Sequence, residues 1–368
     1  MAATGAADRV FNFSAGPAVL PVQVLEEVQR EMVCLPGAGA SLMELSHRGK
    51  VFVDIVESAV EDIRSLLRVP ETHEVLFVQG GATLQFSMIP ANLLRSQDAA
   101  AAYLITGSWG KKALTEARKE GEVDVVYDAS STNFNHAPGA GDFEVKEDAA
   151  YAYYCCNETI QGVQFQSEPQ VPSDVPLVCD ASSDLFSRPL DISKYGLIYA
   201  CAQKNAGPAG ATVVIIRKDL IDRGSDSLPG YLLYKNHANA GSMWNTPATF
   251  PIYVMGKVLK WIQSNFGDLE SMRDHNEAKA KLLYDVLDAN PDFYVGHADE
   301  NARSRMNVTF NLPSDDQLQA FIGSAADAGL ANLKGHRSVG GVRASVYNAM
   351  PIEGVEKLAQ FMTDFASR

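Results

Sequence analysis

The sequence predicts an α/β fold, with a large domain around a mostly parallel central sheet and a small α+β unit at the C-terminal end. Short apolar runs alternate with amphipathic stretches through the first two-thirds of the chain, glycine-rich and polar motifs follow those runs, and the pattern changes near Phe250. Ligands bind such sheets beyond the carboxyl ends of the strands. The motifs at those ends are therefore the candidate functional residues.

The elements of the large domain follow from the spacing of apolar residues, which is short and continuous for buried strands and periodic for helices. The predicted strands are Glu74–Val78, Ala102–Ile105, Val123–Tyr127, Ala150–Cys155, Leu177–Asp180, Leu197–Ala200 and Ala211–Ile216. The predicted helices are Val22–Val33, Val51–Leu67, Leu84–Leu94 and Lys111–Gly121.

The C-terminal part begins with two long predicted helices, Pro251–Phe266 and Asp268–Leu287. We therefore divide the chain into an N-terminal segment (1–16), a large domain (17–258) and a small domain (259–368), with the boundary in or beside the first of these helices. The remaining predicted elements are a strand at Met306–Leu312, a helix at Asp315–Ala328, two short strands around Lys334–Ala344 and a closing helix at Ile352–Phe365.

Composition places the chain among ordinary globular enzymes. Its 368 residues are 46% hydrophobic and 21% charged, and 31 Lys+Arg against 45 Asp+Glu give a net charge of −14. This charge disfavours partners such as nucleic acid or an anionic membrane. An anionic substrate would need a local basic pocket.

The cysteines and the N-terminus favour a cytoplasmic location. The five cysteines are odd in number and lack metal-type spacing, so we expect buried, reduced thiols and no metal site. The first nine residues are small and polar, and no apolar stretch is long enough to span a bilayer. A targeting peptide that has been removed stays an open alternative.

Lys204 is the most informative residue, because it lies between an apolar run and a turn of small residues, Asn205 to Gly210. Burial disfavours the charged form of an amine, so we expect a lowered pKa for this side chain. A lysine of that kind is a nucleophile that can form a Schiff base. The alternative is a lysine at a strand end whose amine reaches solvent.

A strand that runs into Gly80-Gly81-Ala82-Thr83 and then a helix could hold a phosphate, because backbone N–H groups at a helix N-terminus attract anions. A tight strand–helix turn without a ligand is the alternative. The spacing matches neither a Walker loop nor a dinucleotide-binding motif.

Three more polar or aromatic residues follow predicted strands. Asp180 could face a protonated ring nitrogen or cap the next turn at Ser182. Trp109 could stack on a cofactor ring or pack in the core, and Thr159 could donate to a ring oxygen or simply occupy a turn. Together with Lys204 and the glycine turn, these residues supply what pyridoxal 5'-phosphate requires.

The sequence resembles the phosphoserine aminotransferases of the class V, fold-type I pyridoxal-phosphate enzymes along almost its whole length. Matching motifs are Phe11-Asn-Phe-Ser-Ala-Gly-Pro17, Met43-Glu-Leu-Ser-His-Arg-Gly-Lys50, Asn157-Glu-Thr-Ile-Gln-Gly162, Ala202-Gln-Lys-Asn-Ala-Gly-Pro-Ala-Gly210, Met243-Trp-Asn-Thr-Pro247, Ser304-Arg-Met-Asn307, Lys334-Gly-His-Arg-Ser-Val-Gly-Gly-Val-Arg-Ala-Ser345 and Tyr347-Asn-Ala-Met-Pro-Ile-Glu-Gly354.

The resemblance implies a role for each cofactor residue. Lys204 is the lysine that binds the cofactor covalently, Asp180 faces the pyridine nitrogen, Trp109 stacks on the ring and Thr159 donates to the ring oxygen. The phosphate is held by Ala82, Thr83 and Gln203, although many relatives have a third glycine and an arginine or cysteine in this turn. The neighbouring subunit of a homodimer contributes Asn245 and Thr246.

Two basic clusters are expected to bind the substrates, which each carry an α-carboxylate and a second anionic group. Arginine and histidine donors suit both carboxylate and phosphate. By the resemblance, Arg343 holds the α-carboxylate, and Ser14 lies near the amino-acid substrate. The expected ligands of the distal anion are His47, Arg48, His336 and Arg337; an ordinary solvated basic patch is the alternative.

The implied reaction is a two-stage transamination that interconverts O-phospho-L-serine and 2-oxoglutarate with 3-phosphohydroxypyruvate and L-glutamate, in L-serine biosynthesis. The related 4-phosphohydroxy-L-threonine of pyridoxine biosynthesis is a further candidate substrate. The alternatives are a cysteine desulfurase or β-lyase on the same cofactor, for which Cys34 is the only cysteine outside a strand-like run, and a non-catalytic phosphate-binding protein of the same fold.

Overall fold

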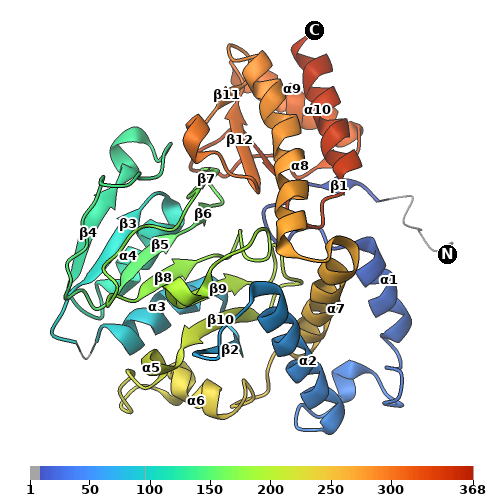
Figure 1. The fold of residues 1–368 in the computed structure, drawn as a ribbon. Helices are drawn as coiled ribbons and strands as arrows, with labels where there is room; N and C mark the ends of the chain where they lie inside the picture. Colours follow the sequence, from blue (N-terminus) through green and yellow to red (C-terminus); the bar gives the residue numbers. More distant parts are fainter. Residues whose placement is uncertain (1–8, 96, 368) are drawn as a thin grey trace.

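The computed structural model describes residues 9–95 and 97–367. A central sheet is covered by helices, and a smaller group of strands and helices that includes α8, α9 and α10 lies at one end of it (Figure 1). The predicted α/β class, with a mostly parallel central sheet, is confirmed.

The central sheet has seven strands in the order β2-β10-β9-β8-β5-β3-β4. The pairs from β9 to β4 are parallel, whereas β10 is antiparallel to both of its neighbours. All residues of β3, β5, β8 and β9 are buried, as is usual where helices cover both faces. The strands are β2 (His73–Val78), β3 (Ala101–Ile105), β4 (Val123–Asp128), β5 (Ala152–Cys155), β8 (Leu177–Asp180), β9 (Tyr195–Cys201) and β10 (Thr212–Arg217).

Successive residues of each strand point to opposite faces, so the sheet serves two hydrophobic cores. On one face, Phe77 and Ile198 pack with helices α1, α2 and α7. On the other, Val78 and Tyr199 pack with α3, α4 and α6. The helices are α1 (Val22–Glu31), α2 (Lys50–Leu67), α3 (Gly81–Leu93), α4 (Ser108–Ala117), α5 (Lys218–Ile221), α6 (Tyr234–Asn239) and α7 (Thr249–Phe266).

The C-terminal unit has its own core, in which Phe321 contacts the rings of Phe310, Phe361 and Phe365. Its three-stranded sheet has the order β11-β12-β14. The elements are α8 (Leu269–Ala289), β11 (Val295–Gly296), β12 (Asn307–Asn311), α9 (Asp315–Asp327), β13 (Leu330–Ala331), β14 (Val342–Ser345) and α10 (Ile352–Ala366).

The beginning of the described chain packs on this C-terminal unit. Strand β1 (Phe11–Asn12) pairs in parallel with β13, and Phe13 is buried in the C-terminal core. This pairing was not predicted from the sequence. The predicted division at residues 258 and 259 falls inside α7, and the domain boundaries stay a prediction.

Most predicted elements are present, with ends shifted by a few residues. The helix predicted at Lys111–Gly121 instead spans Ser108–Ala117, so Trp109 lies in its first turn. Of the two short strands predicted around Lys334–Ala344, only β14 forms, and Lys334 makes a single bridge to Val342. The first of these two strands is therefore reduced to one bridge, and the residues between it and β14 include a turn in which Gly340 and Gly341 have positive φ.

A short hairpin connects the two units beside the carboxyl end of the sheet. It consists of β6 (Asn157–Glu158) and β7 (Val163–Gln164). Thr309 Oγ1 donates to the carbonyl of Gln161 (2.7 Å), and Ser304 N–H donates to that of Gly162 (3.0 Å). Gly162 is required here, since its φ is +70° and a Cβ would lie 2.6 Å from the backbone oxygen of Asn307.

We expect Gly162→Ala to lower the free energy of unfolding by about 2–4 kcal/mol, because it combines a strained φ with a steric clash. Urea denaturation of the cofactor-free chain measures the loss. Gly141→Ala is the matched control: its φ is +90°, but a Cβ there meets no described atom within 4 Å, so about 1 kcal/mol is expected. Equal losses in the two variants would contradict the steric argument.

Candidate active site

A pocket of about 440 Å³ lies at the carboxyl ends of the central strands, where the sequence placed its candidate residues. Ala15, Gly16, Asn157 and Ser183 also line it. The predicted site residues among its walls are Ala82, Thr83, Trp109, Thr159, Asp180, Gln203, Lys204, His336 and Arg343.

Lys204 lies in the turn that follows β9. The carbonyl of Ala202 accepts hydrogen bonds from the N–H groups of Ala206 and Gly207, which closes the turn. The amine, Nζ, donates to Thr159 Oγ1 at 2.7 Å and lies 5.7 Å from the centre of the Trp109 ring. Lys204 therefore points into the pocket and does not extend to bulk solvent as a surface lysine would.

The pKa expected for Lys204 was wrong in direction. Burial by itself lowers the pKa of this amine, but the phenol of Tyr347 and the carboxylate of Asp180 act in the opposite sense, with smaller effects of Cys201 and Cys155. The net pKa of Lys204 is raised. In the free chain the pocket therefore contains a cation, which favours the binding of an anionic ligand.

Asp180 ends β8, and its side chain is only 3% exposed. Its Oδ1 accepts the backbone N–H of Ser182 at 2.9 Å, so the capping role weighed from the sequence is present. The same carboxylate lines the pocket and is close enough to Lys204 to raise the pKa of that amine. Capping fixes the carboxylate without removing it from the pocket.

Trp109 follows β3 and lies in the first turn of α4. Its backbone N–H donates to Glu158 Oε2 at 2.9 Å. The indole Nε1 is buried and has no hydrogen-bond partner among the described residues. The Lys112 amine lies 4.1 Å from the ring centre.

The glycine turn has the geometry of an anion cradle. Gly80 and Gly81 have φ of +93° and +64°, and α3 begins at Gly81, so the N–H groups of its first turn face the pocket end of the sheet. The Ala82 N–H meets Cys201 Sγ at 2.9 Å. The amine of Lys204, the carboxylate of Asp180 and this helix start are the groups that a pyridine aldehyde phosphate needs, so the described residues fit the predicted cofactor.

The mouth of the pocket carries Arg343 and His336. Arg343 Nη1 lies 3.5 Å from the carbonyl of Thr159, and burial lowers the pKa of this guanidinium, with Tyr347 acting in the opposite sense. Burial, together with Arg343, Arg337 and Lys112, lowers the pKa of His336. The imidazole is therefore a neutral donor at physiological pH.

Six predicted residues are not among the walls of this pocket: Ser14, His47, Arg48, Asn245, Thr246 and Arg337. His47 Nε2 is buried without a partner among the described residues. Asn245 Nδ2 donates to Gln79 Oε1 at 3.2 Å, next to the glycine turn. A single chain thus brings most of the predicted cofactor residues together, and leaves Asn245, Thr246 and part of the predicted substrate cluster elsewhere.

Several residues in or beside the site were not predicted from the sequence. Tyr347 donates to the carbonyl of Ala15 (2.9 Å) and raises the pKa of Lys204. Cys201 contacts the glycine turn, and Glu158 binds the start of α4. Glu158 and Tyr347 lie inside motifs that carried the resemblance, which is the signal that could have identified them.

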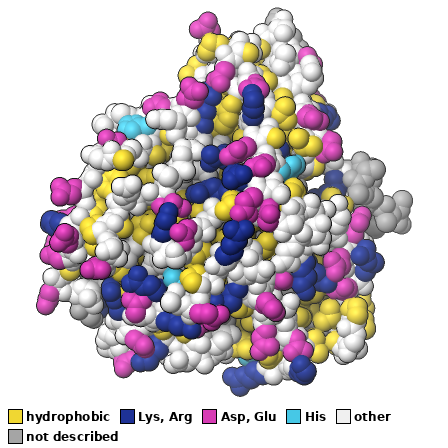
Figure 2. All heavy atoms as spheres, in the orientation of Figure 1, with side chains coloured by type: hydrophobic (Ala, Val, Ile, Leu, Met, Phe, Trp, Pro, Cys, Tyr) yellow, Lys and Arg dark blue, Asp and Glu magenta, His cyan; other side chains and the backbone are white. Residues whose placement is uncertain are grey.

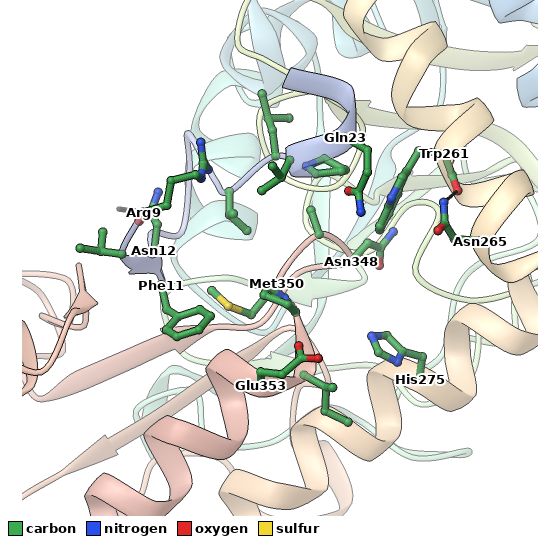
Figure 3. A pocket seen from close by; sticks show the side chains of 18 of the residues that line it. Arg9, Phe11, Asn12, Gln23, Trp261, Asn265, His275, Asn348, Met350 and Glu353 are labelled. Carbon is green, nitrogen blue, oxygen red and sulfur yellow. Dashed lines mark hydrogen bonds between the residues drawn. The ribbon is translucent and has the colours of Figure 1, made fainter. Parts of the chain in front are cut away.

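A larger cavity, of about 760 Å³, lies between the N-terminal segment, α7, α8 and α10 (Figure 3). None of the predicted site residues lines it in the described chain. Burial lowers the pKa of its His275 to about 4, and the amide of Asn348 is occupied by Phe186 and Asn276. Size alone therefore does not locate the chemistry.

A metal site, a charged binding face and a membrane-spanning helix would each show a distinct pattern among the described residues. Within residues 9–95 and 97–367, no group of three His, Cys, Asp or Glu side chains is placed to hold a metal ion. Acidic and basic side chains are intermixed across the face shown in Figure 2. None of the helices in the described ranges combines the length and apolar character needed to cross a bilayer.

All five cysteines are free, and four of them are buried. The expectation of buried thiols was wrong for Cys34, which is exposed just beyond the end of α1.

Comparison with known proteins decides the family. The family model for class V aminotransferases matches residues 10–358. The chain belongs to the class V aminotransferases. It is 61% identical to a phosphoserine aminotransferase of Rhodopirellula baltica and 50% identical to one of Desulfotalea psychrophila, with 98% of this chain covered in both and 96% and 99% of those proteins.

Solved structures of this family have the same fold. A phosphoserine aminotransferase of Bacillus circulans subsp. alkalophilus matches with a TM-score of 0.95 at 45% identity, over 98% of this chain and 99% of that one. A pyridoxal-phosphate-bound enzyme from Trichomonas vaginalis gives 0.91 at 43%, over 96% and 100%. The resemblance, the fold-type I architecture, the aminotransferase class and the cofactor predicted from the sequence are confirmed.

We expect Asp180→Asn to lower the pKa of Lys204 in this class V aminotransferase. The amide can still accept the Ser182 N–H, but it lacks the charge that opposes the effect of burial on the amine. An NMR titration of the labelled lysine amine in the cofactor-free chain measures the change. Asp124→Asn, which removes an exposed carboxylate paired with Lys146, is the control; an unchanged Lys204 pKa in Asp180→Asn would contradict the assignment.

Proposed function

We propose that the chain transfers the amino group of O-phospho-L-serine to 2-oxoglutarate, yielding 3-phosphohydroxypyruvate and L-glutamate, as a cytoplasmic enzyme of L-serine biosynthesis. The convergence of Lys204, Asp180, Trp109 and Arg343 in one pocket carries this proposal. The names of the relatives support the substrate. The same anion-binding groups would also admit 4-phosphohydroxy-L-threonine of pyridoxine biosynthesis.

The cofactor residues have distinct tasks in this proposal. Lys204 would bind pyridoxal phosphate through Nζ, and Asp180 would face its ring nitrogen. Trp109 would cover the ring and Thr159 would donate to the ring oxygen, while Ala82, Thr83 and Gln203 would hold the phosphate at the start of α3. When bound, the cofactor supplies the aldehyde that takes up the amino group and the electron sink that stabilises negative charge at the α-carbon.

Lys204 is also the base of the reaction. As a free amine, Nζ would take the proton from the substrate α-carbon. Thr159 Oγ1, 2.7 Å from Nζ, holds the amine within the pocket during this transfer. The two substrates use one site in turn, so ping-pong kinetics are expected.

Arg343 and His336 provide the donors for the substrate's anionic groups. Arg343 would take the α-carboxylate, since its guanidinium presents paired donors beside Thr159 and keeps its charge. His336 and Arg337 would take the distal phosphate or carboxylate. A neutral imidazole beside a fixed cation accommodates both kinds of anion.

We propose that His47, Arg48, Asn245 and Thr246 complete the site of a second copy of the chain, with Ser14 placed near the substrate of its own pocket. They are absent from the walls of their own pocket in the described chain. Their neighbours include large apolar side chains that a monomer leaves exposed, namely Met43 at 61%, Val51 at 37% and Trp244 at 44%. A homodimer would cover these side chains and bring the polar residues beside them to the partner's pocket.

The desulfurase alternative is not favoured by the cysteines. Burial raises the pKa of Cys155 and Cys201, the two thiols in the pocket walls, so both are protonated and poor nucleophiles. Cys34 is exposed but is not a wall of the pocket.

Lys204→Ala should reduce transamination between phosphoserine and 2-oxoglutarate by at least about a thousandfold, because both the covalent attachment and the base are lost. A coupled assay of glutamate formation measures the rate. Lys194→Ala is the matched control, since this exposed lysine lies at the opposite end of β9. Wild-type turnover in Lys204→Ala would refute the proposed function.

Arg343→Gln should raise the KM for phosphoserine by about 100-fold, since a charge-assisted pair to the α-carboxylate is replaced by a neutral hydrogen bond. Initial-rate kinetics at several concentrations of both substrates measure the change. Arg217→Gln, at the far end of the neighbouring strand β10, should leave KM unaltered. An equal KM in Arg343→Gln and the wild type would exclude this arginine as the carboxylate ligand.

A further inference from the structure

Glu158 is a fully buried carboxylate that the proposed reaction does not use. It lies in β6, between Asn157 and Thr159, and points away from the hairpin toward the start of α4. Its Oε2 accepts the backbone N–H of Trp109 at 2.9 Å, and its Oε1 accepts that of Gly110 at 2.8 Å. A carboxylate in this position both caps the helix and complements its dipole.

The surrounding backbone is shaped to this side chain. A Cβ on Gly107 would collide with the Glu158 carboxyl group, and one on Gly110 would come within 3.3 Å of Oε1. Gly107 has φ of 179°, which any residue can adopt, so the demand for glycine here comes from Glu158 and not from the backbone conformation. The two glycines let the first turn of α4 approach the carboxylate closely.

We propose that Glu158 is a positioning residue, which holds the Trp109 indole in place over the cofactor pocket by binding the backbone of Trp109 and Gly110. The side chain of Trp109 makes no hydrogen bond through Nε1 among the described residues, so its orientation depends on packing and on the backbone that carries it. The backbone at this point is anchored by Glu158 from a different element, β6.

The electrostatic setting makes this anchor sensitive to pH. Burial raises the pKa of Glu158 to about 7, and the N–H groups of Gly110 and Trp109 oppose that effect. Asp180 at the end of β8 raises the pKa further, whereas Lys204 beyond β9 lowers it; Cys155 of β5 is a neutral neighbour. Above pH 7 both oxygens accept hydrogen bonds, and below it the protonated oxygen is a weaker acceptor.

The shifted pKa of Glu158 also makes the stability of the fold depend on pH. Its pKa is higher in the folded chain than the usual 4.5, so folding favours the protonated form. The contribution of Glu158 to stability therefore falls as pH rises from about 4.5 to about 7. The two hydrogen bonds from the start of α4 offset part of the cost of burying the charged form.

The test follows Trp109 itself in the full chain, first without cofactor and then with pyridoxal phosphate. Trp244→Phe and Trp261→Phe leave Trp109 as the only tryptophan. In this background we expect Trp109 emission to change with a midpoint near pH 7, and Glu158→Gln to abolish that change. The same substitution should weaken pyridoxal phosphate binding about tenfold, since one N–H loses its acceptor.

Two further variants are included: Gly110→Ala tests the proposal independently of Glu158→Gln, and Glu116→Gln is the control. Gly110→Ala retains the carboxylate but crowds Oε1, so it should shift the emission midpoint and weaken cofactor binding even if Glu158→Gln fails to fold. Glu116→Gln, on the same helix and paired with Lys119, should change neither property. The idea is overturned if the emission of the background chain is flat from pH 5.5 to 8.5, or if its midpoint survives in Glu158→Gln or is unmoved in Gly110→Ala.

The first readout uses neither substrate nor cofactor, so it stands apart from the proposed function. Loss of phosphoserine turnover with an intact pH 7 transition would argue against the proposed substrate and leave the role of Glu158 standing.

Discussion

The balance of charge around the Lys204 amine is the interaction on which the rest of the pocket depends. Burial disfavours the ammonium, but Tyr347 and then Asp180, which ends the neighbouring parallel strand, act in the opposite sense and raise the pKa of the amine. The carboxyl ends of parallel strands lie at the same edge of a sheet. The cation that follows β9 and the anion that ends β8 are therefore close in space, although they are far apart in the sequence. The pocket is thus charged before a ligand arrives.

The second unit acts on this pocket through neutral hydrogen bonds. Asn157 Nδ2 donates to both Ser183 Oγ and Asn307 Oδ1, at 2.9 Å each, which ties the hairpin to the large sheet and to β12. Asn307 in turn donates to Ser345 and to Tyr347. Buried amides suit such a junction because each can donate and accept, and no charge has to be desolvated. The position of Tyr347 near Lys204 therefore depends on residues from three separate parts of the chain.

The positions of residues that follow from the order of the strands could be predicted from the sequence. The positions of residues that depend on longer-range packing could not. Lys204, Asp180, Trp109 and Thr159 follow strands of one sheet, so their convergence was predictable from the alternating pattern. The pairing of Phe11–Asn12 with Leu330–Ala331 was not, since each strand has two residues and about 320 residues separate them. The direction of the Lys204 pKa was missed for a related reason: it is a sum over groups, including Tyr347, that only the folded chain brings near.

The basic groups at the mouth illustrate how a strongly acidic chain can still select anions. At long range the net charge of −14 repels anions. Salt largely screens this repulsion at distances beyond about 10 Å. Close to the pocket the guanidinium of Arg343 supplies a positive charge, and the lowered pKa of His336 keeps the charge of that imidazole from varying across neutral pH. When the charges of a site do not change with pH, the site distinguishes its ligands by the positions of their anionic groups. In the proposed function, an amino acid with a second anion at the correct separation would bind in preference to one that merely carries more charge.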